Sequence, residues 1–181
     1  SFPTRRSSDL PLGPRLTAPE LSEAFRALDP AAVVCGPESR NAVAEAAAGR
    51  KVVSVGRGAS GPGEPLRAVR PARAGPTSPG GGVRAALWTS GTSGRPRGVL
   101  LDGHGLRVSA RASRLRLGLG SRDRWLASLS VAHVGGLALV IRAAAHCSTL
   151  VVRGKFYPDR FLELADSGAV THASLVPVML R

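Results

Sequence analysis

The residues best suited to chemistry lie in one glycine- and hydroxyl-rich stretch near the middle of the chain. It separates the apolar residues 85–88 from the apolar residues 99–101, and it reads Thr89-Ser90-Gly91-Thr92-Ser93-Gly94-Arg95-Pro96-Arg97-Gly98. Glycine permits positive φ and close approach of the backbone to a ligand. Successive backbone N–H groups, hydroxyls and guanidinium donors together favour bound anions. The stretch therefore predicts a polyphosphate-binding loop between two buried strands; the alternative is a flexible Gly/Ser linker or a surface hairpin.

The spacing of this stretch excludes a Walker A loop, which needs a second glycine, followed by lysine, five residues after the first. Pro96 and Val99 stand at those positions after Gly91 and Gly94. The pattern instead resembles the Thr-Ser-Gly-Thr-Thr-Gly-x-Pro-Lys-Gly signature of the adenylate-forming superfamily, which includes acyl-CoA synthetases and peptide-synthetase adenylation domains. Ser93 keeps the hydroxyl of the second threonine. Arg97 replaces the lysine, and its planar guanidinium differs in geometry from an ammonium group.

A second candidate site surrounds His133, where a predicted strand gives way to a predicted helix. Open α/β sheets bind their ligands at the carboxyl ends of strands. His133 could therefore orient a substrate, and Gly135 and Gly136 leave room for an acyl or aromatic group to approach the backbone. The alternative is a histidine that only caps the turn.

The family resemblance extends through residues 83–181 and is only loose over the first eighty residues. The similar segments are residues 114–119, 123–127, 133–142 and 170–180. They are similar to one branch of the superfamily, the o-succinylbenzoate–CoA ligases of menaquinone biosynthesis. Other acyl- or aryl-CoA synthetases and adenylation domains stay alternatives, because they share variants of each segment. Leu129-Ser130-Val131-Ala132-His133 also departs from the usual Leu-Pro-Leu-aromatic-His, which leaves the shape of the acyl pocket open.

The resemblance implies an ATP-dependent ligase that activates a small-molecule carboxylate as an acyl-adenylate and transfers it to coenzyme A, with Mg²⁺ bound to the ATP. Hydroxyl contacts to phosphate would come from Thr89, Ser90, Thr92 and Ser93. Backbone N–H contacts would come from Gly91, Gly94 and Gly98, and Arg97 would supply the cation. The acyl pocket would be bordered by His133, Gly135 and Gly136. Arg142 is a further candidate for the substrate carboxylate, but helical spacing turns it about half a turn away from His133.

Several family motifs are not found in these 181 residues. They are the Tyr-Gly-x-Thr-Glu acid, the Thr-Gly-Asp of the ribose site and the C-terminal domain with its adenylation lysine. We therefore interpret residues 11–181 as part of an N-terminal adenylation domain, with residues 1–10 a non-native start and residues 56–82 a flexible connection. No catalytic residue and no metal ligand is assigned. We expect negligible ligase activity from this chain alone, and pyrophosphate release from the purified chain would contradict that expectation.

Charge and cysteine content bear on the other classes of function. The formal net charge is +13, and Lys51 and Lys155 are the only lysines among 25 basic residues. Arginines scattered along an Ala-, Gly- and Pro-rich chain are typical of a GC-rich genome, so we expect no nucleic-acid partner; a basic nucleic-acid- or anion-binding module stays the alternative from another class. Arg107, Arg111 and Arg114 form one stripe, which we interpret as a solvated helix face.

Cys35 and Cys147 are too isolated for a zinc site or a disulfide framework. With no membrane-length apolar run and no secretory signal, we predict a cytoplasmic protein; the oligomeric state is not predicted.

Alternating strand and helix signals predict an α/β fold of parallel sheet layers with flanking helices. A capping box at Thr17 and Glu20 opens a helix that ends at Asp29-Pro30. The other predicted helices span residues 39–48, 105–117, 134–145 and 158–166. The predicted strands span residues 31–35, 51–55, 125–129, 149–152 and 169–174. The first two strands form a β-α-β unit, which predicts a parallel pair with a right-handed crossover.

Overall fold

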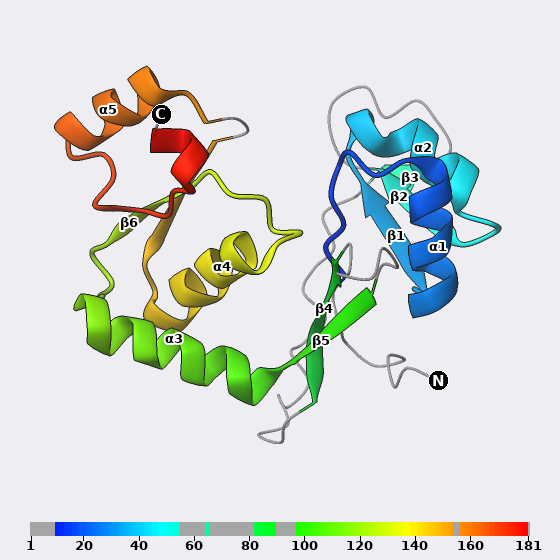
Figure 1. Cartoon of the computed structure of the whole chain (residues 1–181), viewed down its shortest axis with the longest axis horizontal. Helices are drawn as coiled ribbons and strands as arrows, with labels where there is room; N and C mark the ends of the chain where they lie inside the picture. Colours follow the sequence, from blue (N-terminus) through cyan, green and yellow to red (C-terminus); the bar gives the residue numbers. More distant parts are fainter. Residues whose placement is uncertain (1–9, 55–63, 66–81, 90–96, 154–155, 181) are drawn as a thin grey trace. The chain divides into compact units, whose positions relative to one another are not determined.

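The computed structural model describes residues 10–54, 64–65, 82–89, 97–153 and 156–180. They form an α/β fold of parallel strands with flanking helices (Figure 1), as the sequence predicts. The chain divides into two compact units, Ser1–Leu101 and Asp102–Arg181. Each unit has its own parallel three-stranded sheet and its own apolar core. A single partial domain over residues 11–181 stays a prediction.

The first helix, α1 (Ala18–Leu28), begins as the capping box predicts. The carboxylate of Glu20 accepts hydrogen bonds from the backbone N–H and the hydroxyl of Thr17, at 2.8 and 2.7 Å. These bonds lower the pKa of Glu20, the backbone bond contributing most. The predicted apolar face of Leu21, Phe25 and Leu28 is buried, because residues at i, i+4 and i+7 share one side of a helix.

The predicted β-α-β unit follows α1. It consists of β1 (Ala32–Cys35), the 3₁₀ helix η1 (Pro37–Ser39), α2 (Arg40–Ala46) and β2 (Lys51–Ser54). The two strands pair in parallel, with Ala32 opposite Lys51. The fully buried character expected for β1 is wrong: Cys35 is buried, but Val34 is 60 % exposed. The reason is that successive side chains of a strand point to opposite faces of the sheet, and only the face with Val33 and Cys35 packs on the core.

A third strand, β3 (Glu64–Pro65), pairs in parallel with β2. The sequence predicts no strand here, because β3 lies within residues 56–82, which are expected to form only a flexible connection. Apart from β3 and Gly82, that segment lies outside the described residues.

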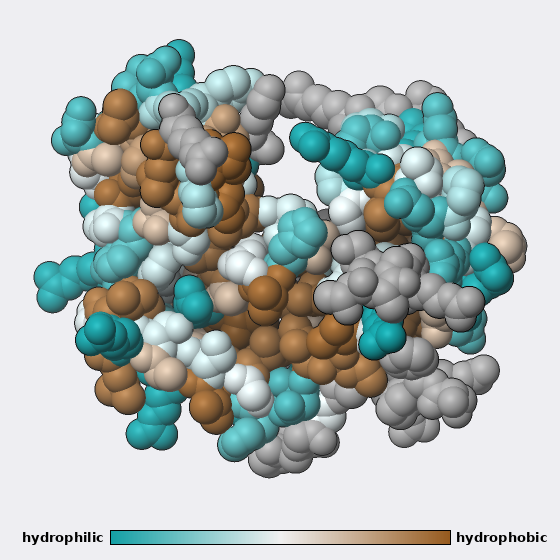
Figure 2. Space-filling view, viewed as in Figure 1, coloured by the Kyte–Doolittle hydropathy of each residue, from teal (hydrophilic) through white to brown (hydrophobic). Residues whose placement is uncertain are grey.

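The strands on either side of the phosphate-loop sequence are β4 (Val83–Thr89) and β5 (Arg97–Asp102), which pair with each other. Ala85, Ala86 and Leu87 of β4 are buried, as expected. The expectation of a second buried strand is wrong, because Val99 and Leu100 of β5 are 45 % and 37 % exposed. In a two-stranded sheet β5 has a neighbour on one side only. Apolar side chains also reach the surface elsewhere, as the brown areas on the face drawn in Figure 2 show.

The second unit begins with α3 (Gly103–Leu117). Its N-cap is Asp102, whose side chain accepts a 2.9 Å hydrogen bond from the backbone N–H of Gly105. Gly118 ends the helix with φ of 67°, a left-handed conformation that glycine adopts without strain. The predicted helix over residues 105–117 is therefore confirmed, with its start two residues earlier.

Strands and helices alternate through the rest of this unit. They are β6 (Arg124–Ala127), α4 (Val134–His146), β7 (Thr149–Val152), α5 (Pro158–Asp166), β8 (His172–Ala173) and the 3₁₀ helix η2 (Pro177–Leu180). The helix over 134–145 is confirmed to within one residue, and β7 and α5 have the predicted bounds. The strand expected over 169–174 is shorter, because its pairing with β6 covers only His172 and Ala173.

The order of strands in the second sheet is β7-β6-β8, all parallel. The chain passes from β6 through α4 to β7 on one side of β6. It then passes through α5 to β8 on the other side of β6. Right-handed crossovers in opposite directions place α4 and α5 on opposite faces of the sheet. The burial pattern agrees: Trp125 packs with Leu139 of α4, and the next side chain, Leu126, faces the other way, towards α5.

Candidate functional site

The strand order of the second sheet creates a switch point between β6 and β8. The segments that follow these two strands both begin at the carboxyl edge of the sheet, where open α/β sheets bind ligands. Residues 128–133 follow β6 and lead into α4, and residues 174–176 follow β8. The sequence predicts a site at residues 128–133, but it does not assign residues 174–176 to any site. Only the strand order brings the two together.

His133 lies where α4 begins, and its backbone forms the turn. Its N–H donates to the carbonyl of Ser130 at 3.1 Å, and its carbonyl accepts from the N–H of Leu137 at 3.0 Å. The imidazole makes no capping hydrogen bond and is exposed. The histidine therefore does not cap the helix through its side chain, and its ring is accessible at the carboxyl edge of the sheet.

The two glycines after His133 have different surroundings. A Cβ at Gly136 would collide with the carbonyl oxygen of Ser130 and lie 2.7 Å from that of Leu129. A Cβ at Gly135 would meet only Leu129 Cδ1, at 3.4 Å. The close neighbour of Gly136 is thus the chain's own backbone, so this glycine shapes the turn. Contact of either glycine with an acyl group stays a prediction.

The predicted phosphate loop is described only at its two ends. Ser90, Gly91, Thr92, Ser93 and Gly94 lie outside the described residues. At the ends, the hydroxyl of Thr89 donates to the backbone carbonyl of Arg97 at 3.2 Å, which joins the last residue of β4 to the first of β5. The hydroxyl of Thr89, predicted to face phosphate, therefore has a role in closing the stem of the loop.

Arg97 and Gly98 continue from this stem into β5. The side chain of Arg97 is exposed and Gly98 is half-buried. Their contacts with phosphate, like those of Thr89, stay predictions.

The remaining basic candidates have surroundings of their own. Arg142 is half-buried on α4 and its Nε has no hydrogen-bond partner among the described residues, so its contact with a carboxylate stays a prediction. His146 Nε2 lies 3.1 Å from the carbonyl oxygen of Ala110. His172 stacks on Trp125 with ring centroids 4.8 Å apart, and its Nδ1 lies 3.8 Å from Asp123 Oδ1.

The described part of the chain lacks two features, a metal-binding cluster and a membrane-length apolar helix. No group of three or more His, Cys, Asp or Glu residues there has a metal-binding arrangement. None of its helices combines the length and the apolar character that a bilayer crossing requires.

Comparison with protein families gives a match across both units. Residues 9–181 match the model of the family described as AMP-binding enzyme. The match includes the stem formed by β4 and β5 and the segments that follow β6 and β8.

Two curated relatives share a functional name. A 2-succinylbenzoate–CoA ligase of Bacillus licheniformis is 37 % identical over 94 residues, which are 52 % of this chain and 20 % of that protein. The protein of the same name from Listeria monocytogenes is 34 % identical over 95 residues, 52 % of this chain and 20 % of the relative. The matched part thus spans about a fifth of the length of these relatives.

Solved structures share the fold over almost the whole chain. ATP-bound MatB from Rhodopseudomonas palustris superposes with a TM-score of 0.72 at 26 % identity, covering 95 % of this chain and 35 % of that one. The o-succinylbenzoate coenzyme A synthetase of Bacillus subtilis, in complex with ATP and magnesium ion, gives a TM-score of 0.75 at 22 % identity. It covers 96 % of this chain and 35 % of that chain.

Proposed function

Because this chain belongs to the AMP-binding enzyme family, we propose that it is part of a ligase that joins a carboxylic acid to coenzyme A at the expense of ATP. In this reaction a carboxylate oxygen attacks the α-phosphorus of ATP, and pyrophosphate leaves as the acyl-adenylate forms. The thiol of coenzyme A then attacks the acyl carbon, loses its proton and displaces AMP, leaving a thioester.

We propose o-succinylbenzoate as the acid. The support is the name shared by the curated relatives, which are up to 37 % identical over half of the chain. The family resemblance of the sequence extends through residues 83–181, where the candidate acyl segments lie. Other aryl or medium-chain acids are the competing substrates.

In this proposal, the stem of β4 and β5 presents residues 90–96 to the outer phosphates of ATP. Backbone N–H groups and hydroxyls of that segment would hold the β- and γ-phosphates while negative charge develops on the departing pyrophosphate. Arg97, the first residue of β5, would supply a permanent positive charge. Bound Mg²⁺ would neutralise further phosphate charge.

The acyl group would lie at the switch point between β6 and β8. The exposed imidazole of His133 lies at this edge of the sheet, and the adjacent N-terminus of α4 carries a partial positive charge that favours a carboxylate. Residues 174–176 would form the opposite wall.

The observation that carries the proposal is the closed stem of the glycine- and hydroxyl-rich segment. The 3.2 Å bond from Thr89 to Arg97 holds the two ends of that segment together between paired strands. A linker between independent domains would not need such a closure.

The decisive experiment is a coupled assay of the gene product for pyrophosphate and thioester. We expect both products with ATP, Mg²⁺, coenzyme A and o-succinylbenzoate. Higher kcat/KM with benzoate or octanoate would replace the proposed acid by another one. Absence of pyrophosphate release with every acid would contradict the ligase itself.

A nucleotide-binding assay separates the ligase from a basic module that binds nucleic acid. Arg97→Ala should weaken Mg-ATP binding about tenfold to a hundredfold, because a charge-assisted contact is lost. Arg97→Lys should restore most of the affinity. Arg122→Ala, which removes one exposed charge from a turn, is the matched control. Equal ATP affinity of all variants, with DNA binding that falls steeply with salt, would favour the basic module.

A further inference from the structure

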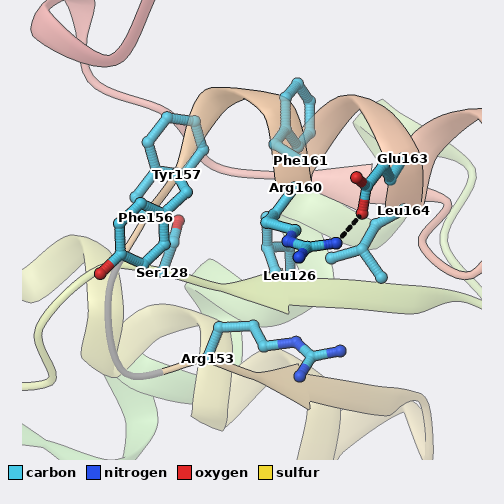
Figure 3. A pocket seen from close by; sticks show the side chains of 9 residues that line it. All are labelled: Leu126, Ser128, Arg153, Phe156, Tyr157, Arg160, Phe161, Glu163 and Leu164. Carbon is cyan, nitrogen blue, oxygen red and sulfur yellow. Dashed lines mark hydrogen bonds and ion pairs between the residues drawn. The ribbon is translucent and has the colours of Figure 1, made fainter.

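A cavity of about 410 Å³ lies in the second unit, between α5 and the strands β6 and β7 (Figure 3). This volume falls in the range of small-molecule sites, roughly 300–1,000 Å³. The cavity opens at the carboxyl edge of the sheet, because Ser128 and Arg153 directly follow β6 and β7. Its lining shares Ser128 with the segment 128–133 but contains none of His133, Gly135 and Gly136, the residues predicted for the acyl pocket.

The lining is unusually aromatic for this chain. Phe156, Tyr157 and Phe161 all contribute to it, in a sequence whose aromatic content is 4 %. The rings of Phe156 and Phe161 lie 5.8 Å apart at 39°, a tilted arrangement. Leu126 of β6 and Leu164 of α5 complete the apolar walls. Such walls favour a flat apolar or aromatic ligand.

The side chains that line the cavity carry a net charge of +1. Arg160 and Glu163 form an ion pair of 2.7 Å and so neutralise each other. Arg153 also lines the cavity and has no ion pair among the described residues. Figure 3 shows Arg153 on the side opposite α5, with Phe156 and Tyr157 at one end and the Arg160–Glu163 pair at the other. One uncompensated guanidinium beside aromatic walls favours a single anionic group.

The cavity persists because α5 does not close onto the sheet. None of the residues of α5 is buried, although Phe161 and Leu164, three positions apart, both face the cavity. In addition, the hydroxyl of Ser128 is buried without a hydrogen-bond partner among the described residues. A ligand with an acceptor group would satisfy this hydroxyl and bury the apolar walls.

We propose that the cavity under α5 is a binding site for a small aromatic carboxylate, separate from the acyl site. The ring lies between Leu126, Phe161 and Leu164, and the carboxylate pairs with Arg153. The proposal requires no ligase activity, because it depends only on the second unit.

Calorimetric titration of the complete chain with 2-naphthoate tests the proposal. Arg153→Gln should weaken binding at least about tenfold, because it removes the charge and keeps a polar side chain. Arg122→Gln is the matched control and should bind as the unmodified chain does. The neutral 2-naphthamide should bind the unmodified chain and Arg153→Gln equally. No naphthoate binding, or equal binding by Arg153→Gln, would overturn the proposal.

Two further variants test the apolar walls. Leu164→Phe should abolish binding by filling the cavity, provided that its circular dichroism matches that of the unmodified chain. Phe161→Leu, which keeps an apolar side chain, should weaken binding severalfold even if Leu164→Phe fails to fold. Unchanged affinity in Phe161→Leu would place the ligand elsewhere. Displacement of naphthoate by o-succinylbenzoate agrees with the proposal, because that compound is itself an aromatic carboxylate. Loss of naphthoate binding in His133→Ala would assign the ligand to the acyl site and overturn the separate role of the cavity.

Discussion

Gly135 and Gly136, at the start of α4, differ in how much space their surroundings leave for a side chain. The sequence presents Gly135 and Gly136 as one pair that leaves room for a ligand. In the structure, the space beside Gly136 holds the backbone of residues 129 and 130, whereas the space beside Gly135 is open apart from one leucine methyl. The packing of the turn that carries His133 therefore depends on one glycine of the two.

Substitution of each glycine by alanine measures this difference. Gly136→Ala should lower the free energy of unfolding by about 1–3 kcal/mol, because the new Cβ overlaps carbonyl oxygens that belong to the backbone. Gly135→Ala should leave it unchanged or raise it by up to about 1 kcal/mol, because alanine favours helix. Urea titration of both variants provides the measurement. Equal effects would contradict the packing around Gly136.

A single hydroxyl joins β6 to the residue before β8. The Oγ1 of Thr171 accepts a 2.9 Å hydrogen bond from the backbone N–H of Arg124, and the N–H of Thr171 donates to the carbonyl of Arg124 at 2.8 Å. The guanidinium of Arg124 also donates to the carbonyl of Gly168 at 2.6 Å. These bonds hold a strand pairing that covers only two residues of β8.

Removal of the hydroxyl tests its contribution. Thr171→Val keeps the shape of the side chain and should cost about 1 kcal/mol of unfolding free energy, the usual net value of one hydrogen bond. Thr171→Ser keeps the hydroxyl and should retain most of the stability. Chemical denaturation distinguishes the two variants, and a valine variant as stable as the original chain would be the contrary result.

At the scale of elements, α3 shows how one carboxylate starts a helix. The bond from the N–H of Gly105 is the main cause that holds the pKa of Asp102 below its ordinary value. Because the pKa is lower in the folded state, this stabilisation is complete above the ordinary pKa. It is lost as the pH falls through the lowered one.

The expected consequence is a pH-dependent effect of substitution at Asp102. Asp102→Ala should lower the melting temperature at neutral pH, and the difference from the unmodified chain should shrink towards about pH 3, where carboxylates become protonated. Asp102→Asn keeps a capping acceptor and should fall between them at neutral pH. Melting curves across this pH range provide the test; a difference that is the same at every pH would rule out the carboxylate as its source.

Helix α5 shows that correct bounds do not imply close packing. Its start at Pro158 and its end at Asp166 are as the sequence predicts. Its relation to the sheet could not be predicted, because the gap between α5 and β6 depends on the loops that connect both elements. The cavity that this gap encloses is the basis of the second ligand site proposed above.

At the scale of the whole molecule, two apolar cores coexist. One is built around Leu21, Phe25 and Val43, and the other around Leu119, Trp125 and Leu139. Each core is drawn from one of the two compact units. Separate cores predict separate cooperative transitions when the chain unfolds.

The two tryptophans of the chain allow this to be measured. Trp88 belongs to the first unit and Trp125 to the second. In Trp88→Phe, fluorescence reports only the second unit, whereas far-ultraviolet circular dichroism reports both. We expect the two probes to give different midpoints in urea. Coincident curves would show that the chain unfolds as one cooperative unit.

The sequence by itself determined the local elements and the chemistry of the central loop. The capping box of α1, the bounds of β7 and α5 and the glycine end of α3 all follow from residues within a few positions of one another. Helix caps and burial periods are interactions of neighbours in the chain, so their pattern is visible in the sequence. The glycine- and hydroxyl-rich signature is local for the same reason.

Only the tertiary structure decided which strands are buried and which loops meet. The exposure of β5, the order β7-β6-β8, the backbone beside Gly136 and the cavity under α5 all depend on residues brought together by folding. The burial of a strand depends on which elements pack against it, and the sequence of the strand alone does not specify those elements. The sequence therefore predicts one part of the candidate acyl site, at His133. The other part, residues 174–176, follows only from the order of strands in the sheet.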